Sequence, residues 1–361
     1  MNGLKECVIF YYPGVISKKP TSGSAQRPYK MLMALREKYS VYEITGELTV
    51  RRKKIKELVK LIKEGKQIKC LYGEFKTTPL IYSNGASDVS LSYLYDFWFL
   101  SFCKRHNVDT SIYIRDLFWQ FDAYKRQVPL YKRLMFRFFY YFDFMLLTQL
   151  VTRIFLPTES IKAFLPVVNP EKVGVLPPGC DDLLVRPRAL VDNKIRIIYV
   201  GGFGFNYDLA WFVKDIPENV QLTLCIRPED VANINFSTER ITVLHLSSGE
   251  LPEEYEKHDL AIVPINKSPY LDVAMPIKVM EAVGNEVPII TTDLKEVSDF
   301  VLLNNIGWII DPDIKSFSTL IDDILSDRTM LEEKKAAIRT CKQKNLWGCR
   351  VDEACTGEGT V

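Results

Sequence analysis

The sequence has few of the residues that build metal and redox sites. Among its 361 residues are three histidines and eight cysteines, and no two cysteines are spaced as Cys-x-x-Cys. Zinc-type ligand spacing is therefore absent. Most of the cysteines lie in apolar runs, which fits buried free thiols in a reducing compartment.

Long apolar runs are also missing. The most aromatic stretch, residues 129–151, is interrupted by Arg137 and Asp143, so it does not predict a transmembrane helix. The apolar run Cys7–Tyr12 is too short for the hydrophobic region of a signal peptide. We therefore expect a cytoplasmic protein.

The two halves of the chain differ in charge. Residues 1–180 hold 28 lysines and arginines against 15 acids, a formal charge of +13, and residues 181–361 hold 19 against 30, a charge of −11. A basic half indicates an anionic partner. Because no nucleic-acid-binding motif accompanies the charge, we expect a membrane surface or a lipid-linked phosphate and no nucleic acid.

Two basic stretches are candidates for contact with an anionic membrane. Residues 51–56, Arg51-Arg52-Lys53-Lys54-Ile55-Lys56, open a strongly basic amphipathic helix. Residues 124–141 mix lysine and arginine with aromatic side chains. Two interpretations of the second stretch stay open: an interfacial helix, or a helix whose aromatic face packs on a sheet.

Short buried-type strands alternate with helical patterns along most of the chain, and a polar stretch at 186–193 separates two such series. Strands are predicted at 6–12, 40–45, 68–72, 80–82, 111–114, 153–156, 172–176, 195–200, 220–226, 241–246, 260–264, 287–291 and 308–310, and helices at 29–38, 51–65, 90–106 and 129–151. This pattern predicts an α/β protein with two Rossmann-like, doubly wound domains and an interdomain cleft. Their predicted bounds are 1–185 and 186–340, followed by a C-terminal helix or tail at 341–361.

The most informative motif lies at residues 275–293. Pro276 suits the first position of a helix. Lys278 then falls in the first turn, beside unpaired N–H groups, where it helps the helix little unless an anion binds there. Glu281 faces the same way one turn later and could accept hydroxyl donors. An ordinary helix with a solvated lysine is the alternative.

This motif resembles the donor site of GT-B glycosyltransferases, especially family-4-like polysaccharide enzymes. The matching residues are Pro276, Lys278, Glu281, Ala282, Pro288 and Thr291. The resemblance implies that Lys278 meets the diphosphate of a nucleotide sugar and that Glu281 meets its ribose. Two positions depart from the family pattern: Glu286 replaces the usual glycine, and Val273 stands where many retaining members have a second glutamate, with Asp272 the nearest acid.

A glycine turn follows the predicted strand at 195–200. Gly201, Gly202 and Gly204 would let the backbone approach a phosphate, although their spacing is not that of a dinucleotide fingerprint and a tight turn is the alternative. The residues after the turn, Asn206-Tyr207-Asp208, resemble a subgroup with teichuronic-acid and xanthan-type glucuronosyltransferases, some of which invert configuration.

The predicted acceptor side contains several polar candidates. A strand delivers Arg115 and Asp116 at its end, where Asp116 would serve as the base for an acceptor hydroxyl and Arg115 would bind a phosphate. A helix-capping Asp116 paired with Arg115 is the alternative. Glu74 is a second acid at a strand end. Ser24, in a polar stretch at 14–28, would offer its backbone to a phosphate or sugar unless that stretch is a plain surface loop.

Together these features predict a metal-independent hexosyltransferase of surface polysaccharide (capsule) biosynthesis, with 1–185 binding the acceptor and 186–340 the donor. No metal-binding carboxylate pair is recognised at a strand end facing the cleft. The donor would be a nucleoside-diphosphate sugar, with UDP the expected nucleotide, and no cofactor is needed. The acceptor would be a lipid-linked or other glycan, met at the inner membrane face by a peripherally bound enzyme. A GT-B epimerase or a non-catalytic bilobed nucleotide-sugar-binding protein are the alternatives.

Overall fold

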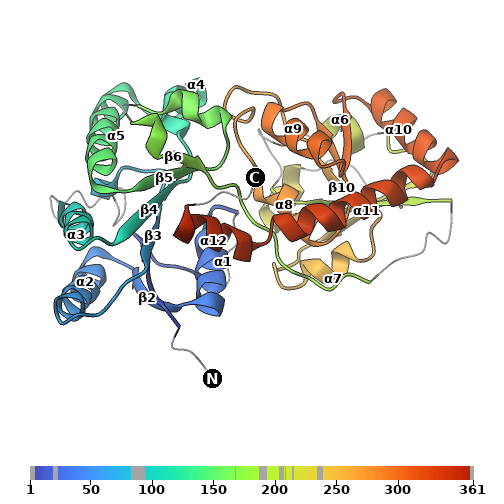
Figure 1. The fold of residues 1–361 in the computed structure, drawn as a ribbon. Coiled ribbons are helices and arrows are strands. Elements are labelled where there is room, and N and C mark those ends of the chain that lie inside the picture. The colour runs from blue at the N-terminus through green and yellow to red at the C-terminus, as the bar shows by residue number, and fades with distance from the viewer. Residues whose placement is uncertain are drawn as a thin grey trace. The chain divides into compact units, whose positions relative to one another are not determined.

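The computed structural model describes residues 5–18, 23–82, 94–166, 168–186, 193–202, 207, 209–213, 215–233 and 239–357. These residues form two compact units (Figure 1). Unit 1 runs to Pro177 and is completed by the chain from Trp347 onward, and unit 2 is the continuous segment Pro178–Leu346. The chain therefore passes between the units twice.

Unit 1 is a parallel six-stranded sheet in the order β2-β1-β3-β4-β5-β6. Its strands are β1 (Cys7–Tyr12), β2 (Ser40–Thr45), β3 (Cys70–Phe75), β4 (Asp109–Ile114), β5 (Arg153–Leu156) and β6 (Val173–Val175). Its α-helices are α1 (Gly23–Lys38), α2 (Leu48–Lys63), α3 (Leu94–Arg105), α4 (Asp122–Gln127), α5 (Leu130–Leu150) and α12 (Trp347–Thr356), with 3₁₀ turns η1 (Leu80–Tyr82), η3 (Phe118–Gln120), η4 (Ser160–Phe164) and η5 (Pro170–Lys172). The inner strands are buried along nearly their whole length, as expected when helices cover both faces of a parallel sheet.

Unit 2 repeats this plan with the order β12-β11-β10-β7-β8-β9. Its strands are β7 (Ile195–Val200), β8 (Val220–Cys225), β9 (Ile241–Leu244), β10 (Leu260–Val263), β11 (Ile289–Thr292) and β12 (Gly307–Ile310). Its helices are α6 (Ala210–Val213), η6 (Pro228–Asn233), α7 (Leu251–Tyr255), α8 (Ile277–Gly284), α9 (Lys295–Leu303), α10 (Ile314–Ser326) and α11 (Thr329–Lys344). Alternate residues of β7 point into different cores, Ile198 into one and Ile197 and Tyr199 into the other, so both faces of the sheet are covered.

Strand order reverses once in each unit. In unit 1 the chain moves from β1 outward to β2 and then returns to the other side of β1 as β3. In unit 2 the same reversal separates β7 from β10. The connections that leave the carboxyl ends of such neighbouring strands diverge, and this is where α/β sheets bind ligands. The relevant connections lead from β7 into the glycine turn and from β10 into α8.

The two-sheet α/β prediction is confirmed, but the structure divides the chain at other residues than the sequence did. The chain leaves unit 1 at Pro177 rather than at 185, and α12 packs against α1 of unit 1 (Figure 1). Lys38 and Asp352 form an ion pair at 2.6 Å across 314 residues of sequence. The C-terminal segment predicted at 341–361 thus combines the end of α11 with a helix that belongs to unit 1.

Two local predictions are wrong. The stretch 14–28 is not a loop throughout, because α1 already begins at Gly23 and contains Pro28. Arg27 is buried with its guanidinium 3.6 Å from the ring of Tyr113, so packing extends the helix upstream of the proline. The segment Leu80–Tyr82, predicted as a strand, is the 3₁₀ turn η1.

The predicted membrane contact of Arg51 is also wrong. Arg51 is fully buried and pairs with Asp96 at 2.7 Å, and it donates a hydrogen bond to the carbonyl of Gly46 at 2.8 Å. On α2, position 51 lies on the inward face with Leu48 and Ile55. A guanidinium in this position serves the core of unit 1 and is not available to a membrane.

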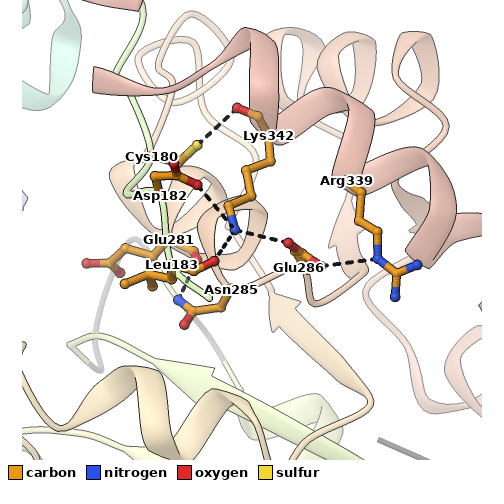
Figure 2. Close-up of polar contacts among 8 residues, drawn as sticks. All are labelled: Cys180, Asp182, Leu183, Glu281, Asn285, Glu286, Arg339 and Lys342. Atoms are coloured by element: carbon orange, nitrogen blue, oxygen red, sulfur yellow. Dashed lines mark hydrogen bonds and ion pairs between the residues drawn. The ribbon is translucent and has the colours of Figure 1, made fainter. Parts of the chain in front are cut away.

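A polar cluster in unit 2 fixes the end of α8 (Figure 2). The ammonium of Lys342, only 2% exposed, pairs with Glu286 at 3.0 Å, donates to the carbonyl of Leu183 and lies 4.0 Å from Asp182. Arg339 holds the other oxygen of Glu286 at 3.2 Å. These contacts connect the chain entering unit 2, the end of α8 and the helix leaving unit 2.

The same cluster explains the departure from the family pattern after α8. Glu286 has a positive φ of 56°, a conformation that favours glycine. Here two cations hold the glutamate in it. Gly284 is required for a different reason, because a Cβ there would lie 3.1 Å from the carbonyl oxygen of Asp181.

Candidate functional site

The loop from β10 delivers Lys278 to the first turn of α8. Pro276 is the residue before the helix, with φ −67° and ψ 137°, and the helix begins at Ile277. Pro276 therefore lies one position earlier than the sequence predicted. It supplies no side-chain cap, and its carbonyl accepts only the N–H of Val279, so the capacity of α8 to bind an anion lies with the N–H groups of Ile277 and Lys278.

Aromatic rings surround the ammonium of Lys278. The nitrogen lies 3.3 Å from the ring centroid of Tyr207, 4.9 Å from that of Tyr199 and 3.5 Å from the Tyr199 hydroxyl. No carboxylate of the described residues lies within 4.0 Å of this nitrogen. The residue as a whole is half-buried, and burial of the amine lowers the pKa of Lys278 to about 7, against the opposing effect of the Glu281 charge.

Gly201 packs directly on Lys278. It has φ of 143°, and a Cβ at this position would lie 2.6 Å from the lysine nitrogen. The structure thus brings the predicted glycine turn to the predicted lysine. Gly202 accepts a 2.5 Å hydrogen bond from the Tyr199 hydroxyl, whereas Gly204 lies outside the described residues.

Glu281 lies one turn after Lys278 on α8 and is half-buried. Its charge acts on Lys278 and helps burial to raise the pKa of Tyr255. Its backbone carbonyl accepts from both the backbone and the side chain of Asn285, which ends the helix. Lysine and glutamate therefore lie on one helix with the spacing that the motif predicted.

Sequence reasoning missed the two tyrosines of this site. Tyr199 is the last residue but one of β7, before the glycine turn, and Tyr207 lies within the segment after that turn, but the sequence motif gives neither a role. Burial raises the pKa of Tyr207 to about 12, so its hydroxyl stays protonated at neutral pH. A tyrosine on each side of a glycine turn that faces a lysine was the available signal.

Asp272 and Asp313 of unit 2 each have a structural partner. Asp272, the nearest acid to the second glutamate of retaining enzymes, accepts a 3.4 Å hydrogen bond from the backbone of Lys295 at the start of α9. Asp311-Pro312-Asp313 follows β12, but Asp313 caps α10 by accepting from the backbone of Ser316 at 2.8 Å. No group of three His, Cys, Asp or Glu in the part of the chain that the structure describes is arranged to hold a metal ion.

In unit 1, the carboxylate of Asp116 is already engaged. One oxygen accepts from Thr77 at 3.0 Å and lies 3.7 Å from the guanidinium of Arg115, and the other accepts from the backbone of Phe118 at 3.1 Å. Arg115 also donates to the hydroxyl of Thr77. These are the hydrogen bonds and the ion pair expected if Asp116 is a structural residue that caps the following turn and pairs with Arg115.

Glu74 lies near the end of β3 in a buried cluster. It accepts from the hydroxyl of Tyr72 on the same strand at 2.8 Å and pairs with Arg27 of α1 at 3.3 Å. Burial raises the pKa of Glu74, against the opposing effects of Arg27 and Tyr72. Ser24 is in the first turn of α1, close in sequence to Arg27, and only its backbone is described.

None of the helices among the described residues combines the length and hydropathy needed to cross a bilayer. None of the eight cysteines, all of them among the described residues, forms a disulfide, and six of them are buried.

Comparison with known proteins identifies the fold. HepE from Anabaena, crystallised with UDP and glucose, aligns with a TM-score of 0.58 at 10% identity over 98% of this chain and 100% of that one. Sucrose-phosphate synthase from Thermosynechococcus elongatus aligns at 0.59 and 14% identity over 96% of both chains. A glycosyltransferase from Rickettsia africae aligns at 0.57 and 12% over 96% of both. No curated protein sequence matches the chain.

The model of the family "Glycosyl transferases group 1" matches residues 231–344, which include α8 and the cluster around Lys342. The described chain thus has the GT-B fold, and this part of it is similar to the group 1 glycosyl transferases.

Proposed function

We propose that the protein is a glycosyltransferase that uses a nucleoside-diphosphate sugar. The observation that carries the proposal is the ammonium of Lys278, which lies at the start of α8 against Gly201 without a carboxylate partner among the described residues. A desolvated lysine beside the first two N–H groups of a helix without a side-chain cap is arranged to receive a diphosphate, because the same anion would satisfy both.

In this proposal Lys278 stabilises the charge that develops on the leaving diphosphate. Glu281 holds the ribose, and Gly201 and Gly202 let the backbone approach the phosphates. Tyr207 lies where the diphosphate would meet the amine, so its ring has to move aside when the donor binds. UDP is the proposed nucleotide, in keeping with the UDP bound to HepE.

The proposed base is either Asp116 or Glu74. The carboxylate of Asp116 is engaged by Thr77, Arg115 and the backbone of Phe118, whereas burial raises the pKa of Glu74 and makes it a stronger base. We therefore favour Glu74 over the original prediction of Asp116. Glu74→Gln would then abolish transfer and preserve nucleotide binding, and Asp116→Asn would act mainly through stability.

The acceptor proposed is a lipid-linked or other glycan of surface polysaccharide synthesis, reached by a peripherally bound enzyme. The proposed reaction is metal-independent, and transfer that persists after dialysis against EDTA would support this. These finer assignments have their support in the sequence motif and in the charge of the N-terminal half.

A thermal-shift panel of UDP, GDP, ADP and CDP tests the donor site. A nucleotide at about a hundred times its Kd should stabilise the protein by roughly 2.7 kcal/mol. Lys278→Ala should abolish the shift and lower turnover about a hundred- to a thousandfold. The matched control is Lys267→Ala, which removes an exposed lysine of unit 2 that pairs with Asp293.

Full transfer by a folded Lys278→Ala protein would refute the assignment. Conversion of the free nucleotide sugar to an epimer without an acceptor would support the epimerase instead. Binding without transfer or donor hydrolysis would support the non-catalytic alternative.

A further inference from the structure

The N-terminal half of α5 exposes an apolar face. Leu130 is 62% exposed, Tyr131 67%, Leu134 62% and Phe138 66%. Met135 is 40% exposed and lies beside them. At about 100° per residue these five positions cover an arc of about 140° on the helix. Isolated exposed apolar residues are ordinary, whereas a continuous face on one helix indicates an interaction surface.

The opposite face of α5 already has its partners. Tyr140, Asp143, Phe144 and Leu147 are the buried residues of the helix. Tyr140 stacks on Trp119 at 4.6 Å and donates a hydrogen bond to the backbone carbonyl of Thr77 at 2.5 Å. The helix is therefore anchored through one side while its other side presents apolar residues to solvent. The buried face packs against α3 and η1 of unit 1, and the interfacial interpretation of the other face stays a prediction.

Cations border the exposed face. Lys132 and Arg137 are exposed and lie just beyond the two edges of the apolar arc. Arg126, exposed on the neighbouring α4, adds a third. Between residues 122 and 142 the chain has five cations and one acid, Asp122, which pairs with Lys125. An apolar centre with a basic border is complementary to an anionic lipid surface, where acyl chains lie beneath phosphate groups.

We propose that this face of α5, defined by Leu130, Tyr131, Leu134, Met135 and Phe138, inserts into the headgroup region of an anionic bilayer. The proposal deepens the proposed function by naming the surface through which the enzyme would reach a lipid-linked acceptor. It assigns the contact to α5 rather than to α2, whose Arg51 is buried. The basic border favours lipid over an apolar protein partner or a second copy, since two copies would bring like charges together.

Co-sedimentation of the full chain with vesicles tests the proposal. We expect binding to vesicles of phosphatidylcholine and phosphatidylglycerol in equal parts, little binding to pure phosphatidylcholine, and weakening by salt. Leu130→Ser/Leu134→Ser/Phe138→Ser should weaken partitioning at least about tenfold, since three inserted apolar side chains are lost. The matched control is Leu302→Ser/Leu303→Ser on α9, which removes side chains that are 61% and 85% exposed.

A second pair of variants tests which group of cations, that bordering the α5 face or that on α2, contributes to vesicle binding. Arg126→Gln/Lys132→Gln/Arg137→Gln should reduce binding more than Lys53→Gln/Lys54→Gln/Lys56→Gln on α2. Leu134→Trp adds a direct readout, because its fluorescence should shift to shorter wavelength with anionic vesicles and be quenched by brominated lipid. Leu302→Trp should show neither change.

The proposal is overturned if the wild type does not bind anionic vesicles at low salt, or if the α5 serine variant binds as well as the wild type. Equal loss in the α2 variant, or self-association that the serine variant abolishes, would also overturn it. Nucleotide thermal shifts separate this outcome from failure of the donor site. Nucleotide binding without vesicle binding refutes the surface alone, and vesicle binding without nucleotide binding refutes the proposed function alone.

Discussion

Lys278 titrates in the range where the proposed donor would need its charge. With a pKa of about 7, it loses its proton above neutrality in the free protein. A bound diphosphate favours the protonated form, so binding takes up a proton. We predict that UDP affinity falls by up to about tenfold per pH unit between about pH 7.5 and 9.5. Calorimetry in buffers of different ionisation enthalpy would measure this uptake.

The substitution Lys278→Ala should remove this pH dependence along with most of the affinity, and Lys267→Ala should preserve both. The same linkage has a consequence for stability. Because the unfolded lysine keeps its proton to a higher pH, the ligand-free protein should gain stability as the pH rises from about 7 to 10. A pH-independent UDP affinity in the wild type would contradict the role given to Lys278.

Asp143 has the opposite effect on how stability depends on pH. Burial raises its pKa from 3.8 to about 7, although the backbone of Leu80 donates to it at 2.8 Å. The folded carboxyl holds a proton between these values while the unfolded one has lost it, so stability falls as pH rises across this window. In Asp143→Asn, the loss of stability between pH 5 and 8 should shrink by about 2 kcal/mol.

Urea unfolding at the two pH values, followed by circular dichroism, would measure the change. Asp122→Asn is the control, because Asp122 is an exposed acid on α4 in the same unit. An unchanged pH slope in Asp143→Asn would show that another group titrates.

At the scale of elements, the cluster around Lys342 holds α8 in place. Glu286→Ala would leave the buried ammonium of Lys342 with only the more distant and largely exposed carboxylate of Asp182, so we predict a loss of about 3–5 kcal/mol of stability. Arg339→Ala should cost less than about 1 kcal/mol, because this guanidinium is largely exposed. Glu286→Ala combined with Lys342→Met should recover part of the loss. Chemical denaturation of the wild type, Glu286→Ala, Lys342→Met and the double variant would test whether the effects at Glu286 and Lys342 are coupled.

The sequence predicts most elements because their apolar periodicity is local. All six strands of unit 2 lie where alternation and turn residues place them, and the lysine of α8 lies where its motif places it. The errors occur where distant contacts decide the outcome. α1 continues upstream of Pro28 because Arg27 stacks on Tyr113, and Arg51 turns inward because Asp96 lies on a neighbouring helix. Neither partner is visible from a window of sequence.

The candidate site could be predicted only in part, because some of its residues are related by local spacing and others by distant contacts. Lys278 and Glu281 share one helix, so their spacing alone relates them. Tyr199 and Tyr207 meet the lysine only after β7 and β10 become neighbours in the sheet. Asp116 and Glu74 looked alike as acids at strand ends, and only their hydrogen-bond partners distinguish them.

At the scale of the molecule, α12 completes unit 1 from the far end of the sequence. Trp347, Val351, Ala354 and Cys355 are buried there, and Cys355 lies against Cys70 of β3 with the sulfurs 2.9 Å apart. Ending the chain at Leu346 exposes this surface. Since a large buried side chain contributes roughly 1.5–3 kcal/mol, the loss approaches the whole stability of an ordinary domain.

We therefore predict that the shortened protein keeps a folded unit 2 and loses unit 1. Limited trypsin digestion should leave a resistant fragment that begins near Pro178, whereas a chain ending at Gly357 should resist as the full chain does. Resistance of both units in the shortened protein would show that α12 is dispensable.

The interrupted course of unit 1 also sets an order for its folding on the ribosome. Unit 2 is one unbroken segment, so all the residues that make its contacts are synthesised before α12. The strands of unit 1 are synthesised early, but the unit is complete only once α12, which follows unit 2 in the sequence, has emerged. Domains in a nascent chain ordinarily mature from the first to the last. In this protein the first-made unit is the last to be finished, and until then the surface that will bind α12 stays open to chaperones and to other nascent chains.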